Sequence, residues 1–159
     1  MRAVLDTNIL ARAFVSKSGP AAECLNRLMM PPNALLSSAP MLLELERVLA
    51  YPRLRALHGM TDEEIRESIK SLALTIEFVD VSSAPPLSIV REDVDDDAVV
   101  ATAVAGAVNV LCTRDAHFYE PAVVAYCSRR GIRIVDELAL LAEIRAAGSA
   151  DDDNSTPSP

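Results

Sequence analysis

Two aspartates stand at the ends of apolar runs that read as β-strands. Asp6 follows residues 3–5, and Asp115 follows residues 108–113. If the two strands are parallel, both carboxylates lie at one edge of the sheet, where such folds bind ligands. Burying a carboxylate there is costly unless a cation compensates the charge. An aspartate such as Asp6 also suits a turn or an N-cap that introduces the segment starting near Asn8, so that interpretation stays open for Asp6 taken alone.

The next candidate, Asp97, lies in a dense acidic run over residues 92–97. Positions 97, 101, 104 and 105 share one face of the helix predicted over residues 95–107, together with small apolar residues. We therefore expect Asp97 to face the sheet and the strand ends. A solvated helix N-terminus explains its neighbours Asp93 and Asp95 better than it explains Asp97.

The fourth candidate, Glu44, lies in an apolar helical run that directly follows a predicted strand. Taken alone, Glu44 also fits an exposed helix surface, paired weakly with Arg47. Because the helix follows its strand at once, its first turns open at the same edge as Asp6 and Asp115. That position favours a role in the site.

The charge balance indicates what four such carboxylates would bind. The chain has 23 acidic and 15 basic residues, a net charge of −8, and only Lys17 and Lys70 as lysines. This balance argues against a general nucleic-acid coat protein, but not against an acidic site that handles phosphates through cations. Mg²⁺ prefers oxygen ligands, so the chemistry indicated is metal-assisted phosphodiester hydrolysis.

The elements that must position these residues alternate between strand and helix. Strands are predicted over residues 3–5, 34–37, 76–81, 108–113 and 132–135, and helices over 20–30, 41–50, 61–72, 95–107, 121–130 and 136–147. Thr61 and Glu64 have the spacing of a capping box. This alternation predicts a three-layer α/β/α sandwich with a central, mainly parallel five-stranded sheet.

The remaining composition bounds the class of protein. We predict one domain over residues 1–148 and a disordered acidic and polar tail over residues 149–159. The widely spaced Cys24, Cys112 and Cys127 suit reduced core thiols. No apolar run reaches the length of a membrane span and no signal peptide opens the chain, so we expect a cytoplasmic protein with no membrane partner.

Four motifs in this order resemble the PIN-domain family, and in particular the VapC-like toxins of bacterial type II toxin–antitoxin modules. They are Val-Leu-Asp-Thr-Asn, Leu-Glu-Leu, Asp-Asp-Asp-Ala-Val-Val-Ala-Thr-Ala and Leu-Cys-Thr-Arg-Asp-Ala-His-Phe. The resemblance extends over residues 2–146. One departure is the acidic loop, which in related proteins often reads Asp-Pro-Asp-Asp and here has Val94 in place of the proline. Asp96 is therefore kept as a substitute or helper for Asp97.

The resemblance implies an endoribonuclease that depends on Mg²⁺ or Mn²⁺ and leaves a 5′-phosphate and a 3′-hydroxyl. It assigns the metal and catalysis to Asp6, Glu44, Asp97 and Asp115. It further implies that Thr7 and Asn8 orient the first carboxylate and that Thr113 positions the last.

Partners follow from the same resemblance and from the position of basic residues. RNA is the expected substrate, and its phosphates would be held by residues near the same edge, namely Arg12, Lys17, Arg47 and Arg114. Ordinary surface charge is the alternative for each. An antitoxin and a homodimer are the other expected partners. His117 is expected to be an exposed loop residue, and a contact with RNA is the alternative for it.

Two other functions compete with this interpretation. A phosphatase or phosphotransfer domain would use Asp6 as a nucleophile. Such a phosphatase would need a second aspartate two residues later, where this chain has Asn8. A phosphotransfer domain of the receiver type would need a lysine at the end of its last strand, and residues 131–135 contain none. A catalytically silent PIN fold that binds RNA or a protein remains the alternative function.

Overall fold

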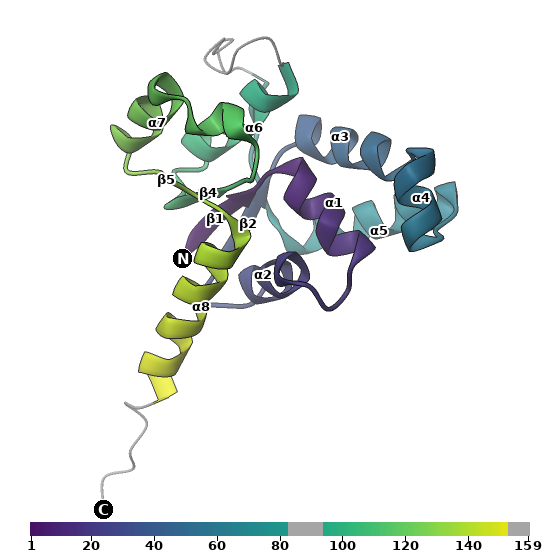
Figure 1. Ribbon diagram of the computed structural model, residues 1–159, viewed down its shortest axis with the longest axis horizontal. Helices are drawn as coiled ribbons and strands as arrows, with labels where there is room; N and C mark the ends of the chain where they lie inside the picture. Colours follow the sequence, from purple (N-terminus) through teal and green to yellow (C-terminus); the bar gives the residue numbers. More distant parts are fainter. Residues whose placement is uncertain (83–93, 153–159) are drawn as a thin grey trace, which may run out of the picture.

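The computed structural model describes residues 1–82 and 94–152 and centres on one five-stranded sheet. All neighbouring strands pair in parallel, in the order β3-β2-β1-β4-β5. The strands are β1 (Arg2–Leu5), β2 (Ala34–Ser37), β3 (Glu77–Phe78), β4 (Val110–Cys112) and β5 (Arg133–Val135). Helices cover both faces of the sheet (Figure 1), which confirms the predicted three-layer α/β/α sandwich.

Side chains of the central strands alternate between the two faces, as the two-residue period of a strand requires. Ala3 and Leu5 of β1 join one hydrophobic core, and Val4 joins the other. The strand β4 divides its side chains in the same way. The alternation therefore turns the next residues of both strands, Asp6 and Thr113, toward the same face.

Helices divide between the two cores. The first core is packed mainly by α1 (Thr7–Val15), α2 (Pro20–Leu28), α3 (Ala39–Leu49), α5 (Asp62–Thr75) and α8 (Glu137–Asp152). The second core is packed by α6 (Val94–Ala105), α7 (Pro121–Ser128) and the 3₁₀ helix η1 (Ala116–Tyr119). The predicted capping box at the start of α5 is present, because Thr61 and Glu64 each accept a hydrogen bond from the other's backbone amide.

The helices α1, α4 (Pro52–His58) and η1 were not among the predicted elements. The helix α3 ends at Leu49, and Pro52 can begin α4 soon after it, because the first turn of a helix needs no amide from proline. Gly59 then ends α4 with a φ of 70°, in the left-handed region that glycine adopts easily.

The structure describes part of the tail predicted over residues 149–159. The helix α8 continues to Asp152, so residues 149–152 are helical although they were assigned to the tail. Residues 153–159 lie outside the described residues, as do Glu92 and Asp93 of the acidic run.

None of the helices within residues 1–82 and 94–152 combines the length and apolar character needed to cross a bilayer.

The three cysteines are free and buried, as predicted. Burial raises the pKa of Cys24 to about 11 and also raises the pKa of Cys112 and Cys127. Thiols with raised pKa values are weak nucleophiles and poor metal ligands at neutral pH. The cysteines therefore contribute to packing, and the chemistry of the molecule lies elsewhere.

Candidate metal centre

Asp6 lies where β1 ends and α1 begins, with its side chain almost completely buried. Its backbone occupies the N-cap position of α1, but its side chain makes no capping hydrogen bond. The carboxylate instead accepts a hydrogen bond of 2.8 Å from the hydroxyl of Thr113, which follows β4. The position of Asp6 thus fits a helix cap, and its side chain joins the ends of two neighbouring strands.

Burial raises the pKa of Asp6, and the charge of Asp115 raises it further. The Thr113 hydroxyl and the backbone amides of Asn8 and Thr7 act in the opposite direction, because they stabilise the ionised form. The largest influences on this pKa are burial, hydrogen bonds and the charge of Asp115, and none of them is a basic side chain. Asp6 is therefore a buried acid whose ionised form would be stabilised by an added cation.

Thr113 connects Asp6 to Asp115. Its buried Oγ1 donates to Asp6 and accepts a hydrogen bond of 2.9 Å from the backbone amide of Asp115. Asp115 in turn caps η1, accepting a hydrogen bond of 2.9 Å from the backbone amide of His117. One hydroxyl thus fixes the relative positions of two carboxylates from different strands.

The face of α6 that packs on the sheet differs from the predicted one. Val99, Val100 and Ala103 are buried, whereas Ala105 is exposed. The valines bury more apolar surface than the small residues of the predicted face, and this decides the rotation of the helix. Asp96 is one turn before Val99 and Val100, so it lies at the N-terminal end of the side of α6 that faces the sheet.

Asp96 lies with Asp115 and His117 in a cluster that could hold a metal ion. One ligand atom from each residue lies within 4.8 Å of the other two. His117 Nδ1 is 3.9 Å from Asp96 Oδ2 and 3.7 Å from Asp115 Oδ1. These separations are shorter than twice a metal–ligand bond of about 2.1 Å, so two such atoms can bind one ion. Asp97 is half-buried on the same turn of α6 but is not a member of this cluster.

Glu44 is linked to the carboxyl edge of the sheet by a hydrogen bond with Thr7. The Thr7 hydroxyl donates a hydrogen bond of 2.7 Å to Glu44 Oε2, which ties α3 to the residue that follows Asp6. Arg47 lies one turn along α3, with its Nη2 3.9 Å from Glu44 Oε1. Glu44 therefore belongs to the same edge of the sheet, with its carboxylate directed at the first residue of α1.

Three of the four basic residues predicted to bind RNA lie beside acidic residues near this edge, and the fourth lies beyond the opposite end of α1. Arg12 and Arg114 both pair with Glu137, the first residue of α8, at 3.6 Å and 2.6 Å. Lys17 is exposed beyond the end of α1. Two of the four residues thus share one carboxylate, and a third, Arg47, lies beside Glu44.

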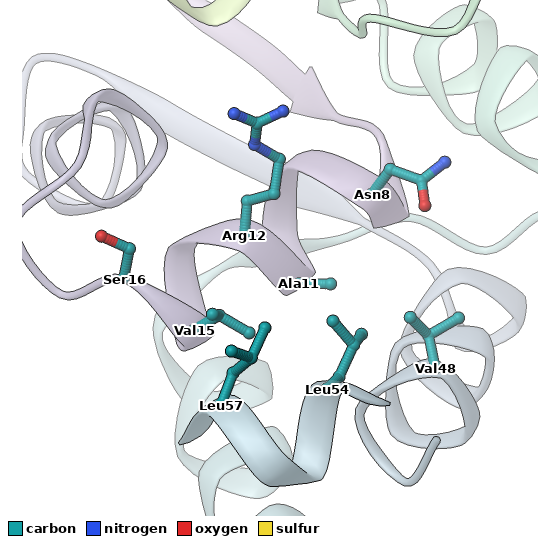
Figure 2. A pocket seen from close by; sticks show the side chains of 8 residues that line it. All are labelled: Asn8, Ala11, Arg12, Val15, Ser16, Val48, Leu54 and Leu57. Atoms are coloured by element: carbon teal, nitrogen blue, oxygen red, sulfur yellow. The ribbon is translucent and has the colours of Figure 1, made fainter. Parts of the chain in front are cut away.

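A largely apolar pocket of about 500 Å³ opens beside α1. It is lined from α1, α3 and α4, with Asn8 and Arg12 as its polar margin (Figure 2). The Asn8 side chain is therefore at the pocket, while its backbone amide is the part that affects Asp6.

Sequence reasoning missed two residues of this region. His117 was expected to be an exposed loop residue, and its ring is exposed, but it also lies against two carboxylates. Glu137 was not considered, although it comes two residues after the end of β5, closer than Asp115, which comes three residues after the end of β4. Extending the search for acids to every strand end would have found Glu137.

The raised pKa of Asp6 predicts how stability depends on pH in metal-free protein. Folded Asp6 binds its proton more tightly than unfolded Asp6, so the free energy of unfolding falls as pH rises from the ordinary carboxyl range through the raised pKa. Asp6→Asn should remove this fall. Urea unfolding at a series of pH values in EDTA measures it, and Asp80→Asn, at an exposed aspartate, should retain it. Equal slopes for Asp6→Asn and wild type would contradict the prediction.

Removing the Thr113 hydroxyl tests its bridging role. Thr113→Val keeps the shape but loses both hydrogen bonds, so we expect affinity for Mn²⁺ to fall by roughly tenfold or more. Isothermal titration measures the change. Thr102→Val is the matched control, because Thr102 is also buried but its hydroxyl bonds to Ser38 and to the Ala98 carbonyl. A loss of the same size in both variants would mean that Thr113 acts only through packing.

Comparison with known proteins agrees with this architecture. The crystal structure of VapBC2 from Rickettsia felis bound to a DNA fragment from their promoter is similar, with a TM-score of 0.55 and 17% identity over 86% of this chain and 100% of that chain. At this identity the likeness concerns the fold. No curated protein matches the chain. A sequence profile of the PIN domain matches residues 2–117, well over half of the chain, and the protein therefore belongs to the PIN-domain family.

Proposed function

We propose that this PIN-domain protein is a metal-dependent endoribonuclease that hydrolyses RNA phosphodiester bonds. The observation that carries the proposal is the convergence of three aspartates at the carboxyl edge of a parallel sheet. Thr113 links Asp6 to Asp115, and Asp96 lies close to Asp115. A buried acid whose pKa is raised by burial and by the charge of a neighbouring carboxylate suits a divalent cation, which stabilises the ionised form.

The donor set fits such a cation. Asp96, Asp115 and His117 offer two carboxylate oxygens and one imidazole nitrogen close together, and Asp6 is near enough to Asp115 for their charges to interact. Carboxylates accept Mg²⁺ and Mn²⁺, and an imidazole favours transition metals over Mg²⁺. When bound, the cation lowers the pKa of water and stabilises charge on the leaving oxygen.

The protein's own residues prepare the site. Thr113 orients Asp6, and the amide of His117 orients Asp115. We assign the ligand from α6 to Asp96, because Asp96 shares the cluster with Asp115, and keep Asp97 of the same turn as a further ligand. Glu44 completes the acidic set from α3, positioned by Thr7. Asn8 supplies its backbone amide toward Asp6.

Substrate and partners complete the proposal. Arg12, Lys17, Arg47 and Arg114 would contact phosphates of the RNA, since an acidic edge cannot bind a polyanion unaided. The sequence motifs typical of VapC-like proteins favour a role as the toxin of a toxin–antitoxin pair, with an antitoxin as protein partner. The similar Rickettsia felis structure is a VapBC2 complex. A homodimer is the other proposed assembly.

Cleavage of a broad set of RNAs tests the activity. With Mn²⁺ or Mg²⁺ we expect internal cleavage giving 5′-phosphate ends, abolished by EDTA and by Asp6→Asn but retained by Glu67→Gln, which changes an exposed glutamate on α5. Denaturing gels and end analysis record the products. No cleavage by wild type, together with equal RNA affinity of wild type and Asp6→Asn, would instead support a silent binding module.

The choice between the two α6 aspartates is separately testable. Because Asp96 heads the sheet-facing side of α6, Asp96→Asn should weaken Mn²⁺ binding by roughly tenfold or more, whereas Asp97→Asn should weaken it less. Isothermal titration of both variants and of Glu67→Gln measures this order. A larger loss of Mn²⁺ affinity in Asp97→Asn than in Asp96→Asn would instead identify Asp97 as the principal ligand from α6.

A further inference from the structure

Glu137 is a buried carboxylate held between two arginines from other elements. It is the first residue of α8 and only 1% exposed. Its Oε2 accepts a hydrogen bond of 2.6 Å from Nε of Arg114, and its Oε1 lies 3.6 Å from Nη2 of Arg12. Three elements, α8, the end of β4 and α1, thus place charged groups around one point.

The charges of this group do not cancel. The amide groups at the start of α8 favour a negative charge at Glu137, and one carboxylate faces two guanidinium groups, which leaves a net positive charge. The arginine side chains are 42% and 54% exposed for Arg114 and Arg12. Arg114 uses only Nε in its hydrogen bond to Glu137, and the described residues give its Nη groups no hydrogen-bond acceptor. Both arginines therefore retain donors for a ligand in solvent.

The group lies next to the acidic edge but on the other side of the strand ends. Arg114 stands between Thr113 and Asp115 in the chain, and alternation along an extended segment turns its side chain away from theirs. Arg12 lies one helical turn beyond Asn8 on α1. Figure 2 shows its side chain rising from α1 away from Leu54 and Leu57, on the other side of the pocket.

We propose that Glu137 is a positioning residue that holds Arg12 and Arg114 side by side as a clamp for phosphates of a single-stranded RNA. This inference rests on the proposed ribonuclease function and adds a specific route for substrate to the acidic edge. Without Glu137, two long cationic side chains would repel each other, and Arg114 would be free to turn to the neighbouring Asp115. With it, their donors are held in place before the substrate binds.

RNA binding in EDTA tests the clamp without requiring cleavage. Fluorescence anisotropy with a fluorescein-labelled single-stranded RNA, at several salt concentrations, gives affinity and its salt dependence. Glu137→Gln should weaken binding, and the slope of log affinity against log salt should become shallower by about 0.7 for each phosphate that the arginines no longer neutralise. Glu143→Gln is the matched control, because Glu143 also lies on α8 and pairs with one arginine, Arg133, at 2.6 Å.

The sign of the effect separates positioning from simple neutralisation. Glu137→Gln raises the net charge of the protein, so a carboxylate that merely neutralised the arginines would, once removed, give tighter RNA binding. Tighter or unchanged binding therefore overturns the proposal. In a background carrying Arg12→Ala and Arg114→Ala, Glu137→Gln should have no further effect. A decrease in affinity of the same size in that background would also overturn it.

A second variant protects the test against misfolding. Glu137→Asp keeps the charge but is shorter by one methylene, and it should bind RNA with an affinity between those of wild type and Glu137→Gln. RNA binding by Glu137→Asp that is as weak as RNA binding by Glu137→Gln would overturn the proposal. If wild type cleaves RNA with Mn²⁺ while Glu137→Gln binds normally, only the clamp fails. If wild type neither binds nor cleaves RNA, the proposed function fails with it.

Discussion

The hydroxyl of Thr113 is the contact on which the candidate site depends. It donates to buried Asp6 and accepts from the amide of Asp115, so it joins the ends of β1 and β4 at one atom. A buried carboxylate is unfavourable by itself, and this hydrogen bond is the side-chain contact that makes it tolerable. The parallel pairing of β1 with β4 brings the three residues into reach, since it ends both strands at the same edge.

Around this contact the sheet edge separates two kinds of charge. Carboxylates from β1, β4 and α6 gather on the face covered by α6, whereas Arg12 and Arg114 meet Glu137 on the face covered by α1 and α8. Alternation along the strands produces this division, because consecutive residues point to opposite faces. Acidic and basic side chains can therefore lie close together in the chain without neutralising each other.

Much of this arrangement could be predicted from the sequence, because it depends on local patterns. Apolar strands that end in Asp6 and Asp115, and helices between the strands, required only the periods of strand and helix. The rotation of α6 required tertiary packing: Val99 and Val100 take the buried positions and turn Asp96 toward the sheet. A local pattern can single out Glu137 as an acid near a strand end, but its two arginine partners come from α1 and from the end of β4, which are distant in sequence, so the pattern does not indicate them.

The pairing of Asp6 with Thr113 also affects the order of events during synthesis. The two residues are 107 positions apart, yet Asp6 is among the first residues made. A nascent chain that has not yet reached β4 has neither the hydroxyl that orients Asp6 nor the second carboxylate. Under the proposed function, RNA cleavage would therefore begin only when β4 docks beside β1, and truncated chains ending before that strand would leave the RNA from which they are translated intact.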